Sequence, residues 1–376
     1  MRVKLGDYIK EYSIKNKNNE DIPVYSVSNS LGFCKDYFGK EVASKNKTTY
    51  KIVPRGCFAY NPSRINVGSV DWQNEEERVI VSPLYNVFSV SPLLDQQYLL
   101  YYLKSNVALS RIRAVASGSV RDNLKLSMLY EFPIDLISLE QQYDVVSTLN
   151  AVQKIIDLYQ KELSGLDELV RARFVEMFGD PMINPYEWEV INISEVLRAK
   201  ASNGFFSRRD DYCDDGNVEV LGVANVVNRM YSQVTDLPRT NANEKDIKKF
   251  EVKYGDMLFC RSSLVAEGIG KASIIPEGVQ TNILFECHVI RLPLDLDKCV
   301  PEFLQTLSTT KFFRNQVISK SKTATMTTIG QDGILKTNII LPPLEKQKEY
   351  YNFVKQIDKS RLLSNHSLYL IKSINF

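Results

Sequence analysis

The sequence contains few of the features that mark membrane or secreted proteins. Its apolar runs, of which Asn338–Leu344 is one of the longest, are too short to cross a bilayer. The first residues, Met1–Asp7, include no apolar core of a signal peptide. We therefore expect a cytoplasmic protein with no membrane partner.

Histidines and paired cysteines are also scarce. There are two histidines, His288 and His366, and six cysteines without a CxxC pair. A structural zinc site needs four clustered Cys or His ligands, so we expect no metal ion and reduced cysteines. Since general acid–base catalysis most often uses histidine, this shortage disfavours many hydrolases.

Complete nucleotide, cofactor and methyltransferase motifs are missing as well. Residues 268–273 resemble a phosphate loop, but Val265 stands where the first glycine should be and alanine follows Lys271. Asn61–Arg64 resembles part of an adenine-methyltransferase motif, yet it lacks the second proline and the aromatic residue that would stack on a flipped base. We expect no cofactor and no catalytic residues.

The composition is that of an ordinary globular protein, with 44% hydrophobic and 24% charged residues. At about 100–200 residues per domain, a chain of 376 residues predicts two or three domains. The formal net charge is only +2. Any contact with nucleic acid must therefore come from local basic patches.

The clearest large-scale feature is an internal repeat with a period of about half the chain. Similar segments recur in the same order, with small changes of spacing that loop insertions would produce. The matched pairs are Val3–Asp7 with Ile191–Glu195, Gly56 with Gly255, Tyr98-Leu99 with Phe303-Leu304, and Leu139–Gln142 with Leu344–Gln347. Each copy begins with short apolar runs between turn residues and ends in a helical pattern.

The helical patterns have the three-and-four spacing of a coiled-coil seam. In the first copy the seam is Val145, Leu149, Val152, Ile156, Tyr159, Leu163, Leu166 and Val170. In the second copy it is Tyr350, Val354 and Ile357, before Arg361 and Ser364 interrupt it. We expect the two helices to pair with each other in antiparallel orientation; the alternative is that each packs on its own globular half.

These patterns predict an α+β protein with two similar mixed α/β domains separated by two long antiparallel coiled-coil helices and related by pseudo-two-fold symmetry. The expected boundaries are 1–138 and 181–340 for the domains, and 139–180 and 341–376 for the helices.

Three motifs carry a family resemblance. Arg173–Pro181, followed by Asn184-Pro185 and Trp188–Val190, is similar to the central junction of type I restriction–modification specificity subunits. Leu341–Gln347 resembles the proline-proline-acidic-glutamine segment before that family's second long helix, and Gly255–Arg261 resembles its glycine-aspartate strand motif. The first copy departs from the pattern, because Cys57 replaces the aspartate after Gly56 and a single Pro133 replaces the double proline.

The resemblance implies a non-catalytic chain with two target-recognition domains, each reading one half of a bipartite site in double-stranded DNA. It implies that the helix pair sets the spacing between half-sites and binds methyltransferase subunits. It also implies that a separate restriction and motor subunit joins for cleavage.

Candidate DNA-contacting residues lie in basic or amide-containing polar segments, because arginine and asparagine pair with base edges while lysine and hydroxyl groups mostly contact phosphates. In copy one they are Arg55, Asn61, Arg64, Arg111, Arg113, Arg121, Asn123 and Lys125. In copy two they are Arg208, Arg209, Arg261, Lys271, Lys320, Lys322, Thr323 and Thr325.

Three alternatives remain open from the sequence. These polar residues can be ordinary solvated surface. The chain can be a coiled-coil scaffold for proteins without DNA specificity. It can also be a DNA-cleaving enzyme on its own, for which acidic residues such as Asp210 and Asp214 would have to cluster in space.

Overall fold

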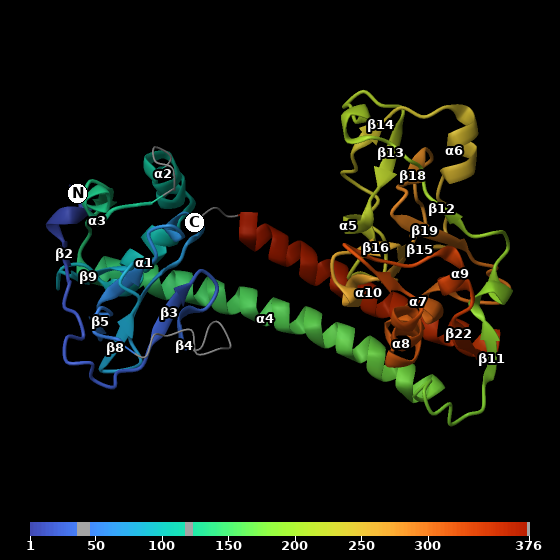
Figure 1. Ribbon diagram of the computed structural model, residues 1–376, viewed down its shortest axis with the longest axis horizontal. Coiled ribbons are helices and arrows are strands. Elements are labelled where there is room, and N and C mark those ends of the chain that lie inside the picture. Colours follow the sequence, from blue (N-terminus) through green and yellow to red (C-terminus); the bar gives the residue numbers. More distant parts are fainter. Residues whose placement is uncertain (36–45, 117–122, 374–376) are drawn as a thin grey trace. The chain divides into compact units, whose positions relative to one another are not determined.

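The computed structural model describes residues 1–35, 46–116 and 123–373, and its elements are labelled in Figure 1. The chain divides into two compact units. Unit 1 is Met1–Tyr159 with Ser367–Phe376, and unit 2 is Gln160–His366. Predicted site residue Arg121 lies outside the described residues.

Unit 1 begins with short strands and then turns helical. Its strands are β1 (Arg2–Lys4), β2 (Ile9–Glu11), β3 (Tyr25–Ser28), β4 (Gly32–Lys35), β5 (Lys51–Pro54), β6 (Phe58–Tyr60), β7 (Val70–Trp72), β8 (Arg78–Val81), β9 (Asn86–Val90) and β10 (Pro133–Asp135). Its short helices are η1 (Leu5–Asp7), η2 (Ile65–Val67), α1 (Gln96–Lys104), α2 (Asn106–Ala116) and α3 (Leu126–Tyr130).

Unit 2 follows the same plan with more strands. They are β11 (Glu189–Asn192), β12 (Ser202–Asn203), β13 (Val218–Leu221), β14 (Arg239–Thr240), β15 (Asp256–Cys260), β16 (Ser262–Ser263), β17 (Ala272–Ile274), β18 (Ile283–Phe285), β19 (Val289–Pro293), β20 (Lys322–Thr323), β21 (Thr327–Thr328) and β22 (Asn338–Leu341). Its short helices are η3 (Ile193–Val196), η4 (Arg209–Asp211), α5 (Val223–Val226), α6 (Glu244–Phe250), η5 (Ala266–Gly268), α7 (Pro301–Thr309), α8 (Lys311–Ser319) and α9 (Gln331–Leu335).

The sheets confirm the internal repeat. The main sheet has the order β2-β9-β6-β7 in unit 1 and β12-β19-β15-β17 in unit 2, with all neighbours antiparallel. In both units the first strand also pairs with the last one, β1 with β10 and β11 with β22. The two copies therefore share one topology, and unit 2 differs by added pairs such as β13–β14.

The matched glycines sit in equivalent turns before the central strand. Gly56 has φ +86° and Gly255 has φ +81°, a left-handed conformation that favours glycine. After Gly255, the buried carboxylate of Asp256 accepts from the backbone N–H of Lys253 and pairs with Arg198. In unit 1 the buried Cys57 takes this place, so the glycine-aspartate motif supports the turn through an ion pair in one copy only.

The two long helices are α4 (Leu139–Phe178) and α10 (Leu344–Ser373). With 40 residues, α4 is about 60 Å long at a rise of about 1.5 Å per residue. It ends before Gly179, which has φ +76°. Among the described residues, no helix combines the length and apolar composition needed to cross a membrane.

Each long helix has a buried glutamine in its first turn. Gln142 accepts from the backbone N–H of Asp95 and donates to the carbonyls of Leu93 and Ile137. At the matched position, Gln347 accepts from the backbone N–H of Val300 and donates to the carbonyl of Pro342. The side chain thus links the first turn of each helix to the start of α1 or α7.

Aromatic rings join both long helices to the core of unit 2. Phe174 and Phe178 of α4 pack against Phe303 of α7 and Tyr350 of α10, with ring centroids 4.9–5.7 Å apart. The Tyr350 hydroxyl donates to the carbonyl oxygen of Val170 and lies 3.0 Å from Oγ1 of Thr306. These residues are almost wholly buried, so α10 packs on α4 and on the globular part of unit 2 together.

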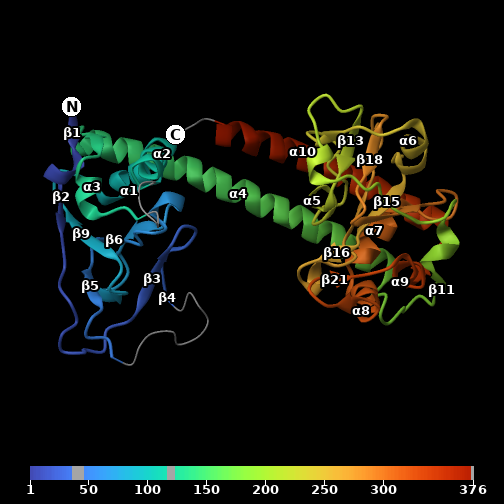
Figure 2. The ribbon, with the colours of Figure 1, turned by 45° about the horizontal axis from the view of Figure 1, so that its top comes forward.

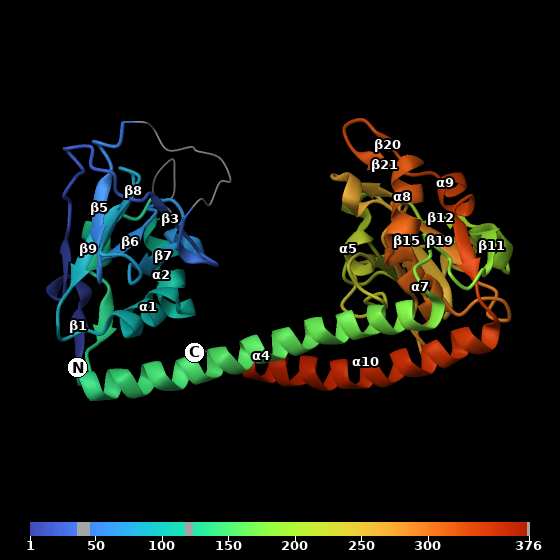
Figure 3. The same ribbon diagram turned by 90° about the horizontal axis from the view of Figure 1, so that it is seen from below.

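The two helices are antiparallel within unit 2, and Figure 3 shows them along the same side of the unit. Arg173 of α4 contacts Glu349 of α10, whereas Asp167, farther back along α4, contacts Arg361, farther along α10. Ser364 donates to Glu162 at 3.1 Å. The polar residues that interrupt the sequence pattern of α10 therefore have polar partners on α4.

The predicted seam residues differ in burial along α4. Val145, the first seam residue, is exposed, and Val170, the last one, is buried. The seam residues between them are half-buried: Leu149, Val152, Ile156, Tyr159, Leu163 and Leu166. On α10, Tyr350 and Val354 are buried and Ile357 is half-buried.

One buried carboxyl makes the stability of unit 2 depend on pH. Glu302 on α7 is 1% exposed, its Oε1 accepts from the hydroxyl of Tyr231 at 3.1 Å, and its Oε2 is buried without a hydrogen-bond partner in the described chain. Burial, helped by the nearby carboxylates of Asp358 and Glu277, raises the pKa of Glu302 from 4.5 to about 7.

We predict that this group destabilises unit 2 as pH rises. The folded state holds the Glu302 proton to a higher pH than the unfolded chain does, so the free energy of unfolding should fall by about 2–3 kcal/mol between pH ~4.5 and ~7. The variant Glu302→Gln should remove this fall, and the exposed control Glu168→Gln should keep it. Denaturant unfolding at several pH values measures the difference; parallel curves for both variants would contradict the prediction.

Candidate nucleic-acid interface

In unit 1, the structure brings together two polar segments that are far apart in the sequence. The turn Asn61–Arg64 follows β6, and the segment Asn123–Lys125 precedes α3. The Ser63 hydroxyl donates to Oδ1 of Asn123 at 2.7 Å, and the backbone N–H of Leu124 donates to the carbonyl of Pro62 at 3.1 Å. We call Asn61, Ser63, Arg64, Asn123 and Lys125 the unit 1 cluster.

Hydrogen bonds hold the turn of this cluster in place. Oδ1 of Asn61 accepts from the backbone N–H of Ser63 at 3.1 Å, and the buried Tyr60 hydroxyl donates to the carbonyl of Leu124. Arg64, Asn123 and Lys125 are exposed. A rigid backbone therefore presents a guanidinium, an amide and an ammonium group to solvent, which are the groups that read bases and bind phosphates.

The helix α2 adds two further exposed cations beside this turn, because α2 packs on η2, which directly follows Arg64. Arg113 is exposed, and Arg111 is exposed with its guanidinium 5.8 Å from the centroid of the Phe132 ring. Being two positions apart, the two arginines point to different sides of the helix.

Arg55 is exposed, but its guanidinium is tied to a neighbouring loop of unit 1. Its Nε donates to the carbonyl of Glu76 at 3.2 Å, and its Nη2 donates to the carbonyl of Glu75 at 2.8 Å. These bonds shape the loop before β8 and use two donors of the guanidinium, so Arg55 belongs to the support of the domain more than to the unit 1 cluster.

In unit 2, the equivalent edge is a small polar sheet. β16 follows the central strand β15 and pairs with β21, which pairs with β20. Figure 2 shows β16 and β21 beside α8. We call residues 322–328 the unit 2 hairpin; its exposed members include the predicted Lys322, Thr323 and Thr325, and Thr328.

Several hydrogen bonds order this edge. Oγ1 of Thr323 lies 3.0 Å from Oγ1 of Thr327, and Nδ1 of His288 lies 3.3 Å from the Ser262 hydroxyl. Arg261 is half-buried, and its Nη1 donates to the carbonyl of Cys287 at 3.2 Å. Among the described residues, this edge therefore presents mainly hydroxyl groups and the Lys322 ammonium group, with Arg261 at its base.

Arg208 and Arg209 are exposed on the loop after β12. That loop is tied to the same strand end, because Phe205 forms a bridge with Glu286, next to the Cys287 that contacts Arg261. Asp211 caps the turn by accepting from the backbone N–H of Arg208. The acidic neighbours Asp210 and Asp211 lower the net charge of this loop.

Two predicted lysines form contacts within unit 2. Nζ of Lys320 donates to the carbonyl of Lys336 at 2.5 Å, and burial lowers the pKa of Lys320. Nζ of Lys271 donates to Oδ1 of Asn228 at 2.6 Å. The Lys271 side chain lines a pocket to which no residue of the unit 2 hairpin contributes.

Sequence reasoning left Ser63, His288 and Thr327 out of the candidate set. Ser63 and His288 enter their edges through partners that are distant in the chain, Asn123 and Ser262, whereas Thr327 contacts Thr323, four residues away in the same hairpin. Only the polar run around Thr327 and Thr328 gave a local signal for these positions.

Comparison with known proteins places the chain in a family. The profile of the type I restriction modification DNA specificity domain matches residues 3–168 and 185–372, so both copies are covered. The chain belongs to this family. The matched ranges cover most of both units and of both long helices, and they confirm the family that the sequence motifs indicate, although the Arg173–Pro181 junction lies between the two matches.

Curated relatives are similar over nearly the whole chain. The MjaVIII specificity subunit of Methanocaldococcus jannaschii is 23% identical over 95% of this chain and 85% of the relative. The EcoKI specificity subunit of Escherichia coli is 20% identical over 93% of this chain and 78% of the relative.

Two solved structures share the fold of this type I specificity chain. One comes from work on complex assembly and conformational transition of the type I R-M system, with a TM-score of 0.57 and 15% identity over 100% of this chain and 95% of that one. The other is the type I S subunit of M. genitalium, with a TM-score of 0.52 and 12% identity over 100% and 93%. They confirm an α+β fold with two repeated domains and long helices.

Proposed function

We propose that the chain is the DNA sequence-specificity subunit of a type I restriction–modification complex and reads two separated half-sites in double-stranded DNA. The observation that carries the proposal is the repeated edge. These edges adjoin the segments that follow the central strands β6 and β15. Unit 1 exposes Arg64 and Asn123 there, and unit 2 exposes Lys322 and Thr323. Family membership supplies the target class.

In this proposal, residues 1–138 and 181–340 are the two target-recognition domains, and 139–180 and 341–376 are helical spacers. The helices set the gap between half-sites. Methyl transfer and cleavage belong to partner subunits, so the chain itself is not an enzyme. A cytoplasmic location, where such a complex would meet DNA, is part of the same proposal.

The long helices also suit partner binding. Leu362 and Leu363 on α10 are 70% and 72% exposed, and the exposed Tyr369 and Leu370 follow about two turns later. Large apolar side chains that stay exposed near one another often mark protein contacts. We propose that methyltransferase subunits cover this part of α10 and that the restriction subunit joins the resulting complex.

Footprinting of the chain with its methyltransferase partner tests the function. We expect protection of two short half-sites with an unprotected gap, and an affinity that falls steeply with salt because phosphate contacts release counterions. A protein-only scaffold would show no specific footprint. A DNA-cleaving enzyme would nick DNA as the isolated chain with divalent metal, and either result would refute the proposal.

Replacing Arg64 with alanine tests the unit 1 cluster. If the guanidinium pairs with a guanine, the change should cost about 1–3 kcal/mol and relax recognition at one position of one half-site. If it contacts a phosphate, binding should weaken for all sequences and the salt slope should drop by about one. Competition binding with single-base variants separates the two results.

The matched control is Arg2→Ala, which removes the same exposed charge from β1. An equal loss of affinity for Arg2→Ala and Arg64→Ala would show that only overall charge matters. The unit 1 cluster would then have no specific role.

A further inference from the structure

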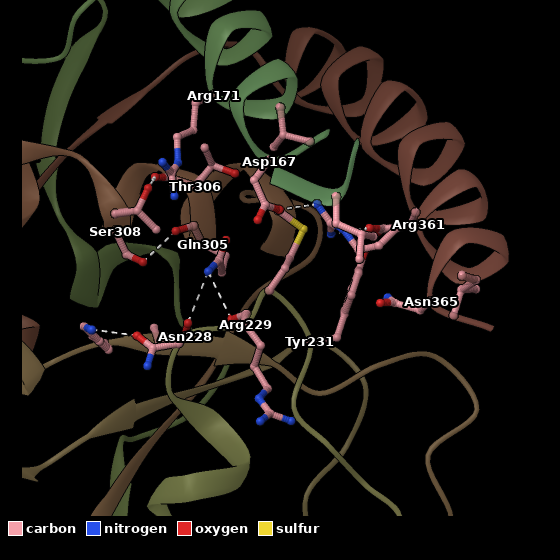
Figure 4. A pocket seen from close by; sticks show the side chains of 18 of the residues that line it. Asp167, Arg171, Asn228, Arg229, Tyr231, Gln305, Thr306, Ser308, Arg361 and Asn365 are labelled. Carbon is pink, nitrogen blue, oxygen red and sulfur yellow. Dashed lines mark hydrogen bonds and ion pairs between the residues drawn. The ribbon is translucent and has the colours of Figure 1, made fainter. Parts of the chain in front are cut away.

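Unit 2 contains a pocket of about 780 Å³ whose lining includes no residue of the unit 2 hairpin. Figure 4 shows side chains from α4, α7, α10 and the segment 228–231 around it. Its volume lies in the range of about 300–1,000 Å³ that is typical for small-molecule sites. The lining holds more basic than acidic side chains: Arg171, Arg229, Lys271, Arg314 and Arg361 against Asp167 and Asp358.

Two of the cations are already engaged. Arg361 pairs with both acidic residues, Asp167 at 2.5 Å and Asp358 at 2.8 Å. Arg229 donates to Oε1 of Gln233 and to the carbonyls of Ala224 and Val227, and its guanidinium turns away from the other labelled side chains in Figure 4.

The other three cations, Arg171, Lys271 and Arg314, have no carboxylate partner within the described chain. Figure 4 shows Arg171 extending from α4 toward Thr306. Lys271 makes one hydrogen bond, to Asn228. Three cations of the pocket lining therefore lack a carboxylate partner within the described chain.

Among these three cations, Arg314 has a buried donor without a hydrogen-bond partner. Its Nη2 donates to the carbonyl of Glu267 at 3.0 Å, but its Nη1 is buried with no hydrogen-bond partner among the described residues. Burial also lowers the pKa of Arg314. A buried guanidinium donor without an acceptor costs free energy, so turning the Arg314 guanidinium toward an anion in the pocket would be stabilising.

The remaining lining suits the uncharged part of an organic molecule. Leu163, Met230 and Leu362 supply apolar surface, while Ser308 and Asn365 supply hydrogen-bonding groups. We propose that this pocket binds a small phosphorylated organic molecule of about nucleotide size, with its phosphate on Arg171, Lys271 and Arg314. A stiff DNA duplex suits the exposed hairpin edge and not a recess beside two helices. Lys271 is thereby reassigned from DNA contact to this pocket.

Calorimetric titration of the full chain without DNA tests the pocket, with AMP, inorganic phosphate and adenosine as probes. We expect AMP to bind more tightly than phosphate, and adenosine least. Because charge-assisted contacts contribute most, Arg171→Gln and Lys271→Gln should each weaken AMP binding about tenfold or more. Lys161→Gln removes an exposed charge from another face of α4 and should leave AMP binding unchanged.

Three results would overturn the proposal. The first is no heat with AMP at about 5 mM, a concentration that reveals even a millimolar Kd. The second is an equal AMP affinity for Lys161→Gln and the two pocket variants. The third is displacement of AMP by a short nonspecific duplex, which would assign the cations to DNA phosphates. None of these results depends on the proposed sequence specificity, which footprinting tests separately.

Discussion

Replacing Tyr350 with alanine should destabilise unit 2 by about 3–5 kcal/mol, because a fully buried aromatic ring leaves a cavity. This ring contacts Phe174 and Phe178 of α4, so its loss also loosens α10 from α4. For a unit of this size the melting temperature should fall by about 10 °C.

Differential scanning calorimetry measures this effect. Tyr350→Phe keeps the ring and removes the hydroxyl that contacts Val170 and Thr306, so it should cost only about 1 kcal/mol. The control Tyr369→Ala changes a 70% exposed ring on the same helix and should leave the melting temperature of unit 2 almost unchanged. Similar losses for Tyr350→Ala and Tyr369→Ala would disprove the packing argument.

Replacing either buried glutamine with alanine should cost about 3 kcal/mol or more, since each leaves buried backbone groups unpaired. Gln142→Ala strands the N–H of Asp95 and the carbonyls of Leu93 and Ile137. Gln347→Ala strands the N–H of Val300 and the carbonyl of Pro342. The first variant should weaken unit 1 and the second unit 2.

Limited proteolysis in increasing urea distinguishes the two units by their fragments. The exposed Gln356 on α10 gives the matched control, and Gln356→Ala should leave both units as they are. If either buried-glutamine variant resisted urea as well as this control does, the hydrogen bonds would not hold the helix starts.

The sequence predicted the elements whose signal is local. Apolar spacing and flanking prolines predicted long helices at 139–180 and 341–376, within three residues of the bounds Leu139–Phe178 and Leu344–Ser373. The repeat matched Gly56 with Gly255, and both adopt a left-handed turn.

The rest depends on pairings that are distant in the chain. The sheet order, the contact of Ser63 with Asn123 and the pairing of Ser262 with Thr328 all join segments that no local pattern links. Arg55 and Lys320 are similar in sequence terms to Arg64 and Lys322, yet their donors bind backbone carbonyls inside their own units. Only the fold decides which cations remain free.

The pairing of first and last strands in each unit has a genetic consequence. Arg2 lies opposite Asp135 and Glu189 lies opposite Leu341, so the two chain ends of each reading module are neighbours on adjacent strands, about 4.8 Å apart. A module with adjoining ends can be cut out and replaced by one with a different surface without stretching its flanks. Recombination at these strand pairs would give a new target sequence in one event.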